Sequence, residues 1–193
     1  MAQQAKPNPI ELYEAAVKLM QPIVAGVKPS QLTASTPCTT WNVQALLSHN
    51  IKVAQWAQGL ITGGPATVNP MEVSGALPRE GAAAAFSSGT AAVLAALKGR
   101  GVLEKVITTP FGQMPVGQFI MFPMLDIVIH KWDLAKGTNQ NVSLDAGLSQ
   151  VCFNVLQMGV EQGRKGGVFG PEVKVPISAS IQNKLLALSG RKP

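Results

Sequence analysis

The feature that most constrains this fold is a helical period of apolar residues along much of the chain. Near the N-terminus, apolar side chains recur at spacings of three and four, which places them on one helix face: Ile10, Tyr13, Val17, Met20, Val24 and Val27. Asn8-Pro9 is a typical helix start, since asparagine caps the first turn and proline fits its first position. Pro22 is expected to kink this first helix or end it early.

Five further helices are predicted from the same period and from cap residues, glycines and prolines. They cover residues 41–60, a segment opened by Pro78 and closed before Gly99, residues 116–136, a segment from a Ser143 cap to residue 162, and residues 178–188. Pro123 is expected to kink the fourth helix or delay its start. Residues 62–77 and 166–176 are rich in glycine and proline and are predicted loops.

One segment, residues 104–117, does not fit a helix, because it holds Pro110, Gly112 and Pro115. We expect a short hairpin there, pairing residues 106–109 with 113–116. The predicted architecture is therefore an all-α, four-helix bundle with a short hairpin and extra C-terminal helices. The length of 193 residues favours a single domain over residues 1–193.

Charge and hydropathy exclude several partners. The net charge of +6 arises because there are only 10 acidic residues, and the 16 basic residues are scattered, so no nucleic-acid partner is expected.

The longest apolar stretch, residues 119–129, is interrupted by Pro123 and Asp126 and is shorter than the roughly 20 residues of a membrane span. Residues 1–9 are polar, with no visible signal peptide. Two cysteines are too few for a disulfide scaffold. The expected location is cytoplasmic, with unpaired thiols.

The chain has only two histidines, His49 and His130. Asp126 precedes His130 by four residues, so both lie on the same face of a helix. Asp126 interrupts a strongly apolar run, where a lone buried carboxylate is costly and a divalent cation would remove the cost. A histidine from a facing helix would complete a three-ligand site with an open position, as in catalytic zinc sites. The alternative is a hydrogen-bonded Asp–His pair with His49 as an ordinary, partly buried histidine.

Four segments resemble one known family: residues 36–49 (TPCTTWNVQALLSH), 126–135 (DIVIHKWDLA), 168–176 (VFGPEVKVP) and 185–193 (LLALSGRKP). They are similar to the DinB-like superfamily, in the branch related to the metal-binding domain of mycothiol-dependent maleylpyruvate isomerase. The resemblance implies a helical bundle in which His49, Asp126 and His130 bind a divalent metal, zinc or nickel. The isomerase itself usually has glutamate at the Asp126 position. Because aspartate is one methylene shorter, the metal would sit closer to the helix of Asp126 or be held more loosely.

The resemblance also implies a reaction class, since its members use a low-molecular-weight thiol such as mycothiol or bacillithiol. Metal coordination deprotonates a thiol, and the thiolate is the nucleophile. We therefore expect a metal-dependent thiol transferase acting on a small electrophile. Maleylpyruvate isomerisation itself is not expected, because the isomerase has a further C-terminal domain for which this chain leaves no room. The alternatives are a non-catalytic metal-binding or small-ligand-binding protein and a non-haem Fe(II) oxygenase, since two histidines and a carboxylate also suit Fe(II). The weakly charged chain also makes a homodimer plausible.

Other residues near these motifs allow two interpretations each. Asp133 could orient the imidazole of His130 or serve as a structural hydrogen-bonding residue. Cys38 precedes a helix start, where the helix dipole can lower a thiol pKa, but a small buried residue is the simpler interpretation. Cys152 is expected in the core. Three tryptophans are expected in the core or in the wall of a pocket: Trp41, Trp56 and Trp132. Three cations could bind an anionic ligand: Lys52, Lys131 and Arg164.

Overall fold

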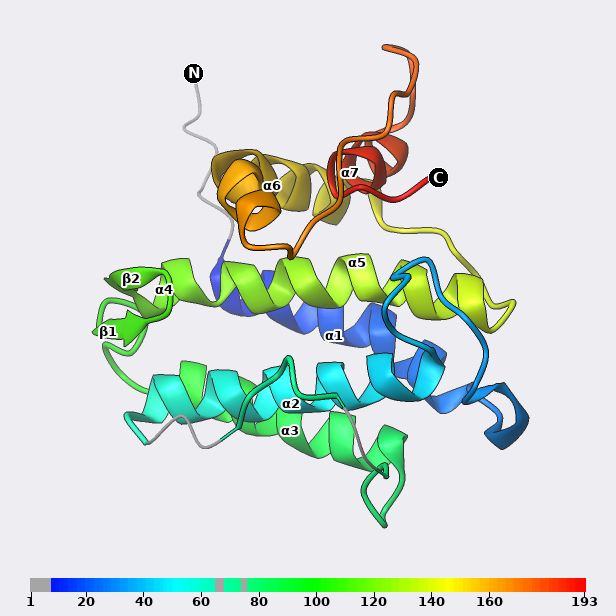
Figure 1. The fold of residues 1–193 in the computed structure, drawn as a ribbon. Coiled ribbons are helices and arrows are strands. Elements are labelled where there is room, and N and C mark those ends of the chain that lie inside the picture. Colours follow the sequence, from blue (N-terminus) through cyan, green and yellow to red (C-terminus); the bar gives the residue numbers. More distant parts are fainter. Residues whose placement is uncertain (1–7, 65–67, 74–75) are drawn as a thin grey trace.

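The computed structural model describes residues 8–64, 68–73 and 76–193, and it is mainly helical (Figure 1). The bundle consists of α1 (Pro9–Ala25), α2 (Val43–Thr62), α3 (Ala82–Leu97) and α5 (Met121–Gly137). In Figure 1, α1 and α5 run side by side through the middle, with α2 and α3 below them. The predicted all-α bundle is confirmed.

The C-terminal helices form a second layer on α5. Helix α6 (Ala146–Lys165) packs on α5, and α7 (Ile181–Leu188) packs on α6 (Figure 1). Helix α5 is therefore covered by α1, α2 and α6, which explains why its sequence is apolar nearly all round. Within the described parts of the chain, no helix combines the length and the apolar character that a membrane crossing requires.

The hairpin is confirmed, with its second strand one residue earlier than predicted. Strands β1 (Val106–Thr109) and β2 (Gly112–Pro115) pair antiparallel, with Ile107 opposite Met114. Val116 belongs instead to the short helix α4 (Val116–Phe119). A 3-10 helix, η1 (Pro29–Gln31), follows α1. Two predicted regions lie partly outside the described residues: of the polar segment 1–9 only residues 8 and 9 are described, and the loop 62–77 has two gaps.

Several predicted helix starts are wrong by two to four residues. The second helix begins at Val43, not at residue 41, because the Asn42 side chain accepts a hydrogen bond from the Ala45 N–H. The third begins at Ala82 because Pro78 initiates a turn that ends at Gly81, whose φ is +86°. A residue with this positive φ is not itself helical, so the helix begins after it, and the conformation suits glycine.

Two further differences concern helices α5 and α6. The predicted fourth helix is broken at Ile120 into α4 and α5, with Pro123 in the first turn of α5, where proline is tolerated. The predicted Ser143 cap is wrong, since Asp145 caps α6 by accepting from the Leu148 N–H at 2.8 Å. Pro22 lies inside α1, which ends three residues later.

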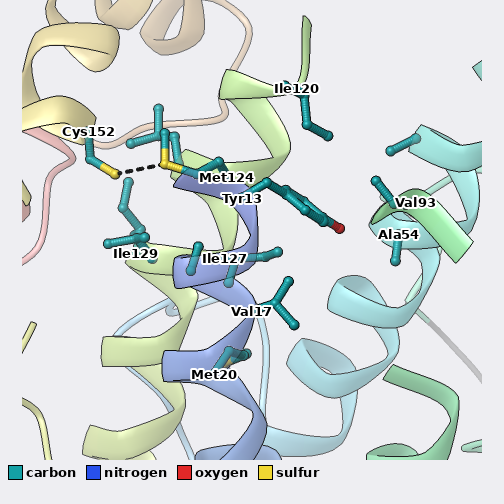
Figure 2. Packing of buried hydrophobic residues seen from close by; sticks show 14 of the residues in the cluster. Tyr13, Val17, Met20, Ala54, Val93, Ile120, Met124, Ile127, Ile129 and Cys152 are labelled. Carbon is teal, nitrogen blue, oxygen red and sulfur yellow. Dashed lines mark hydrogen bonds between the residues drawn. The ribbon is translucent and has the colours of Figure 1, made fainter. Parts of the chain in front are cut away.

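The core joins all layers of the bundle. Figure 2 shows Tyr13 and Val17 of α1 pointing toward Ala54 of α2 and Val93 of α3. On the opposite side of the cluster, Met124 of α5 meets Cys152 of α6; the Cys152 thiol donates to the Met124 sulfur at 3.7 Å. Cys152 is fully buried, as predicted, and burial raises the pKa of its thiol to about 12.

Candidate metal centre

Helices α2 and α5 bring the three predicted ligands together. His49 lies on α2 and faces Asp126 and His130, which are one turn apart on α5. Oδ1 of Asp126 lies 3.2 Å from Nε2 of His49 and 3.4 Å from Nε2 of His130. One nitrogen or oxygen atom from each of the three residues lies within 4.8 Å of the other two. The pairing of two helices thus places two imidazoles and one carboxylate around one position.

Each imidazole is oriented by a hydrogen bond from its other nitrogen. Nδ1–H of His49 donates to the carbonyl of Pro70 at 2.8 Å, and Nδ1–H of His130 donates to Oδ2 of Asp133 at 2.9 Å. A carbonyl and an ionised carboxylate only accept hydrogen bonds, so Nδ1 carries a proton in both rings. In the neutral imidazole Nε2 then presents a lone pair, which is the form that a metal ion binds.

Asp126 distinguishes a metal site from a simple ion pair. Its side chain is 29% exposed, yet Oδ2 is buried and has no hydrogen-bond partner among the described residues. Both histidines approach Oδ1, so an ion pair leaves Oδ2 unsatisfied, and a buried unpaired carboxylate oxygen is costly. A divalent cation held by Asp126 and the two imidazoles would remove this cost. The donor set fits the metal, since two histidines and one carboxylate are common ligands of catalytic zinc.

The same charges shift the pKa values of the metal-free protein. Burial opposes ionisation of Asp126, but the adjacent charges of His49 and His130 outweigh it and hold the pKa of its carboxyl well below the usual range. Burial also opposes the charge on His130, and the Asp126 carboxylate outweighs it and raises its pKa to about 9. Without a metal, a proton on His130 therefore takes the place of the cation.

Asp133 is fully buried and joins His130 to the C-terminus. In addition to His130, it accepts from Arg191: Nη2 donates to Oδ2 at 2.9 Å and Nε to Oδ1 at 3.3 Å. Of the two interpretations of Asp133, the structure supports the one in which it orients the imidazole. Arg191 was not predicted as a site residue, although it belongs to the glycine–arginine pair of the segment 185–193.

Cys38 lies beside this group, within 4.8 Å of ligand atoms of His130 and Asp133. Both oxygens of Asp133 already accept from Arg191, and the guanidinium would repel a cation there. These three residues therefore do not fit a second metal site. Burial raises the pKa of the Cys38 thiol, although Arg191 and a hydrogen bond with Thr40 act in the opposite direction. The structure supports the simpler interpretation, a half-buried thiol without an activated thiolate.

The tryptophans lie where they were expected. The ring of Trp41 lies 4.4 Å from that of His49 and 5.8 Å from that of His130, so it forms a wall of the centre. Its loop is fixed by Thr36, whose hydroxyl donates to the Trp41 carbonyl at 2.7 Å. Trp132 is buried, and Trp56 packs against Phe119.

The three cations considered for an anionic ligand all have protein acceptors. Lys131 is buried and donates to the carbonyls of Asn141 and Ser143 at 2.6 Å each. Lys52 donates to the Glu72 carbonyl, in the same loop whose Pro70 holds His49. Arg164 binds the carbonyls of Leu188 and Gly170 and the carboxylate of Glu161.

Comparison with known proteins identifies the family of this chain. The family model described as "Mycothiol maleylpyruvate isomerase N-terminal domain" matches residues 13–135, a range that contains His49, Asp126 and His130. The chain belongs to this family. The resemblance predicted from the four sequence segments is thereby confirmed.

Relatives and solved structures of this family differ in how closely they match. Two Mycobacterium tuberculosis proteins described as uncharacterized, from strains CDC 1551 / Oshkosh and ATCC 25618 / H37Rv, are each 26% identical over 190 residues. The match covers 95% of this chain and 98% of each relative. Two crystal structures of mycothiol-dependent maleylpyruvate isomerase have a similar fold. The structure of a histidine-to-alanine mutant gives a TM-score of 0.58, and a second structure of the isomerase gives 0.55, both at 14% identity. They cover 89% of this chain and 76% of the isomerase, and they establish the shared fold.

Proposed function

We propose that this chain binds one divalent metal ion through His49, Asp126 and His130 and uses it to activate a low-molecular-weight thiol for transfer to a small electrophile. The observation that carries the proposal is the buried Oδ2 of Asp126, which has no hydrogen-bond partner among the described residues, next to two imidazoles whose protons are held on Nδ1. Zinc or nickel suits this donor set, since imidazole binds both.

The chemistry needs both the metal and the protein around it. A bound metal ion lowers the pKa of a coordinated thiol, so that the nucleophilic thiolate forms at neutral pH. The chain contributes orientation: the Pro70 carbonyl holds His49, and Asp133 holds His130. The ring of Trp41 excludes water from one side of the imidazoles. The partial exposure of Asp126 leaves the centre accessible to a ligand.

A pocket near the start of α2 shares Trp41 with the centre, and none of the three candidate ligands lines it. This pocket has a volume of about 380 Å³ and is lined by Trp41, Ala45 and hydroxyl-bearing residues such as Thr39 and Thr40. Its size falls within the usual range for small ligands. Ala45 precedes His49 by four residues, so the two share one face of α2. The dependence of the crystallised relatives on mycothiol supports a thiol as the co-substrate.

A second candidate function is a non-catalytic metal-binding protein. It is favoured by the engagement of Lys52, Lys131 and Arg164 with protein acceptors, which leaves none of these three cations free to hold an anionic substrate. The two functions share the metal centre and differ in turnover.

The first experiment measures metal in protein purified without a histidine tag. The wild type is expected to hold about one zinc or nickel ion per chain, and His49→Ala and His130→Ala less than about a tenth of that, because each removes one of only three ligands. Thr90→Val is the matched control, since Thr90 is a buried polar residue of α3 bonded to the Phe86 carbonyl. Unchanged metal content in both histidine variants would show that the ligand set is wrong.

The second experiment decides between the functions. Metal-loaded wild type is incubated with mycothiol or bacillithiol and a panel of small electrophiles, and thiol consumption is followed. Thiol transfer above the rate of free metal, absent in His130→Ala, supports the enzyme. A metal-loaded protein without turnover on the whole panel supports the binding protein.

A further inference from the structure

Arg191 belongs to the C-terminal segment that follows α7, beyond the residues 13–135 that the family model matches. It is only 8% exposed, and its partner Asp133 has no exposed surface. The two residues are 58 positions apart in the chain. A buried pair between such distant segments suggests that the C-terminal segment serves the centre.

A tight turn delivers Arg191 to this place. Helix α7 ends in a Schellman motif, in which the Gly190 N–H donates to the Ala187 carbonyl and the Arg191 N–H donates to the Leu186 carbonyl. Gly190 has a φ of +84°, and a Cβ there would lie 2.9–3.0 Å from backbone atoms of Gly170. Only glycine fits this position, so the Gly190–Arg191 pair forms a unit: the glycine makes the turn and the arginine enters the core.

All three guanidinium nitrogens of Arg191 donate hydrogen bonds to acceptors within the protein. Nη2 and Nε hold the two oxygens of Asp133, and Nη1 donates to the Ser189 carbonyl at 3.0 Å. The guanidinium is therefore not arranged to bind a substrate. Its bidentate grip fixes the plane of the Asp133 carboxylate, and the remaining interaction of that carboxylate is with Nδ1–H of His130.

We propose that Arg191 is a positioning residue of the metal centre, which orients Asp133 and through it holds His130 with Nε2 directed at Asp126. The proposal rests on the proposed metal site. Without Arg191, Asp133 would be a buried charge with one partner fewer and could rotate away from the imidazole. His130 would then lose its fixed ring orientation, and metal affinity would fall. The three candidate ligands lie within the matched range 13–135, and the C-terminal segment outside that range thus completes their centre.

The test compares two arginines that hold the same segment. Arg164 binds the carbonyls of Leu188 and Gly170, but the structure records no contact between it and Asp133. Zn²⁺ affinity is measured by competition with a chromophoric chelator, and the coordination geometry is followed in the visible spectrum of Co²⁺-substituted protein. Arg191→Met is expected to weaken Zn²⁺ binding about 10–100-fold and to alter the Co²⁺ spectrum. Arg164→Met is expected to leave both unchanged.

Arg191→Lys provides the intermediate case, because lysine keeps the charge but lacks the two-pronged geometry. It is expected to recover only part of the Zn²⁺ affinity, and it also serves if Arg191→Met does not fold. Wild-type Zn²⁺ affinity and Co²⁺ spectrum in the Arg191 variants would overturn the inference while the proposed function stands. Equal loss in the Arg164 and Arg191 variants would also overturn it, since the role would then be structural. If the wild type binds no metal, the proposed function fails and the inference with it.

Discussion

Two faces of helix α5 are both buried, but they differ in whether their polar groups all have hydrogen-bond partners. Around Met124, the helix packs on α1 and α6 through apolar side chains and a contact with Cys152. On the side that faces α2 and the C-terminal segment, it carries Asp126, His130 and Asp133. On the apolar face of α5, no described side chain has a buried polar atom without a hydrogen-bond partner, so this face needs no further ligand.

On the polar face, only some of the polar groups have hydrogen-bond partners. Asp133 has hydrogen-bond partners for both oxygens, whereas Oδ2 of Asp126 has none among the described residues. With the proposed metal site, this difference assigns stability and metal binding to different faces of one helix. Changes near Met124 should therefore alter the free energy of unfolding, and changes at Asp126 should alter metal binding.

The largest expected effect is a loss of stability without a loss of metal. Met124 is fully buried, so Met124→Ala removes packing against Cys152 and leaves a cavity. It should lower the free energy of unfolding by about 2–5 kcal/mol. Urea unfolding of the metal-free protein measures this loss, and metal analysis of the folded variant should match the wild type. A variant that lost metal in proportion to stability would show that the two regions are not separate.

The next effect is the stabilisation by metal itself. Zinc at 100 times its dissociation constant should raise the free energy of unfolding of the wild type by about 2.7 kcal/mol. Asp126→Asn should remove this gain, because the carboxylate ligand is lost. Asp145→Asn is the matched control, since Asp145 caps α6, outside the centre. Thermal unfolding with zinc and with a chelator measures both, and equal gains in the two variants would contradict the assignment of Asp126.

The sequence predicted the helices well, since the apolar period and the glycines and prolines are local signals. It placed several helix starts wrongly, because a cap depends on which side chain reaches the backbone. Asp145 caps α6 instead of the predicted Ser143, and Gly81 separates Pro78 from α3.

The candidate ligands were accessible to sequence reasoning for a different reason. The four-residue spacing of Asp126 and His130 singled out these two residues. His49 followed as the only other histidine in the sequence, on a facing helix, and the family resemblance supported all three. Arg191 and the Pro70 carbonyl were not accessible, because their partners Asp133 and His49 are distant in the chain. Such contacts follow from tertiary packing, which no local period records.

A smaller effect is expected from the turn that delivers Arg191. Gly190→Ala forces an alanine into left-handed backbone, which costs about 1–2 kcal/mol, and it also brings the Cβ against Gly170. Gly167→Ala is the control, with a φ of +73° but no atom within 4 Å of the added Cβ. Gly190→Ala should therefore lose more stability, and it alone should weaken Zn²⁺ binding. Equal effects on Zn²⁺ binding would separate the turn from the metal centre.

A pH dependence is also expected, and it is confined to the polar face of α5. Burial opposes the charge on His130, and the Asp126 carboxylate raises its pKa to about 9 in the metal-free protein. A raised pKa contributes stability that is complete below the unfolded value of about 6.5 and is lost as the pH rises through about 9. The metal-free protein should therefore become less stable across this window, by at most about 1.4 kcal/mol per pH unit for one proton.

Zinc should cancel this pH dependence, because a metal ion binds the unprotonated imidazole and replaces the proton. Urea unfolding across the same window, with zinc and with a chelator, gives the two slopes. His130→Gln should flatten the dependence of the unfolding free energy on pH in the metal-free protein. Met124→Ala should lower the unfolding free energy but keep its dependence on pH, since Met124 is on the apolar face. A metal-free wild type whose stability does not change between these pH values would show that His130 and Asp126 do not form the charged pair that the metal is proposed to replace.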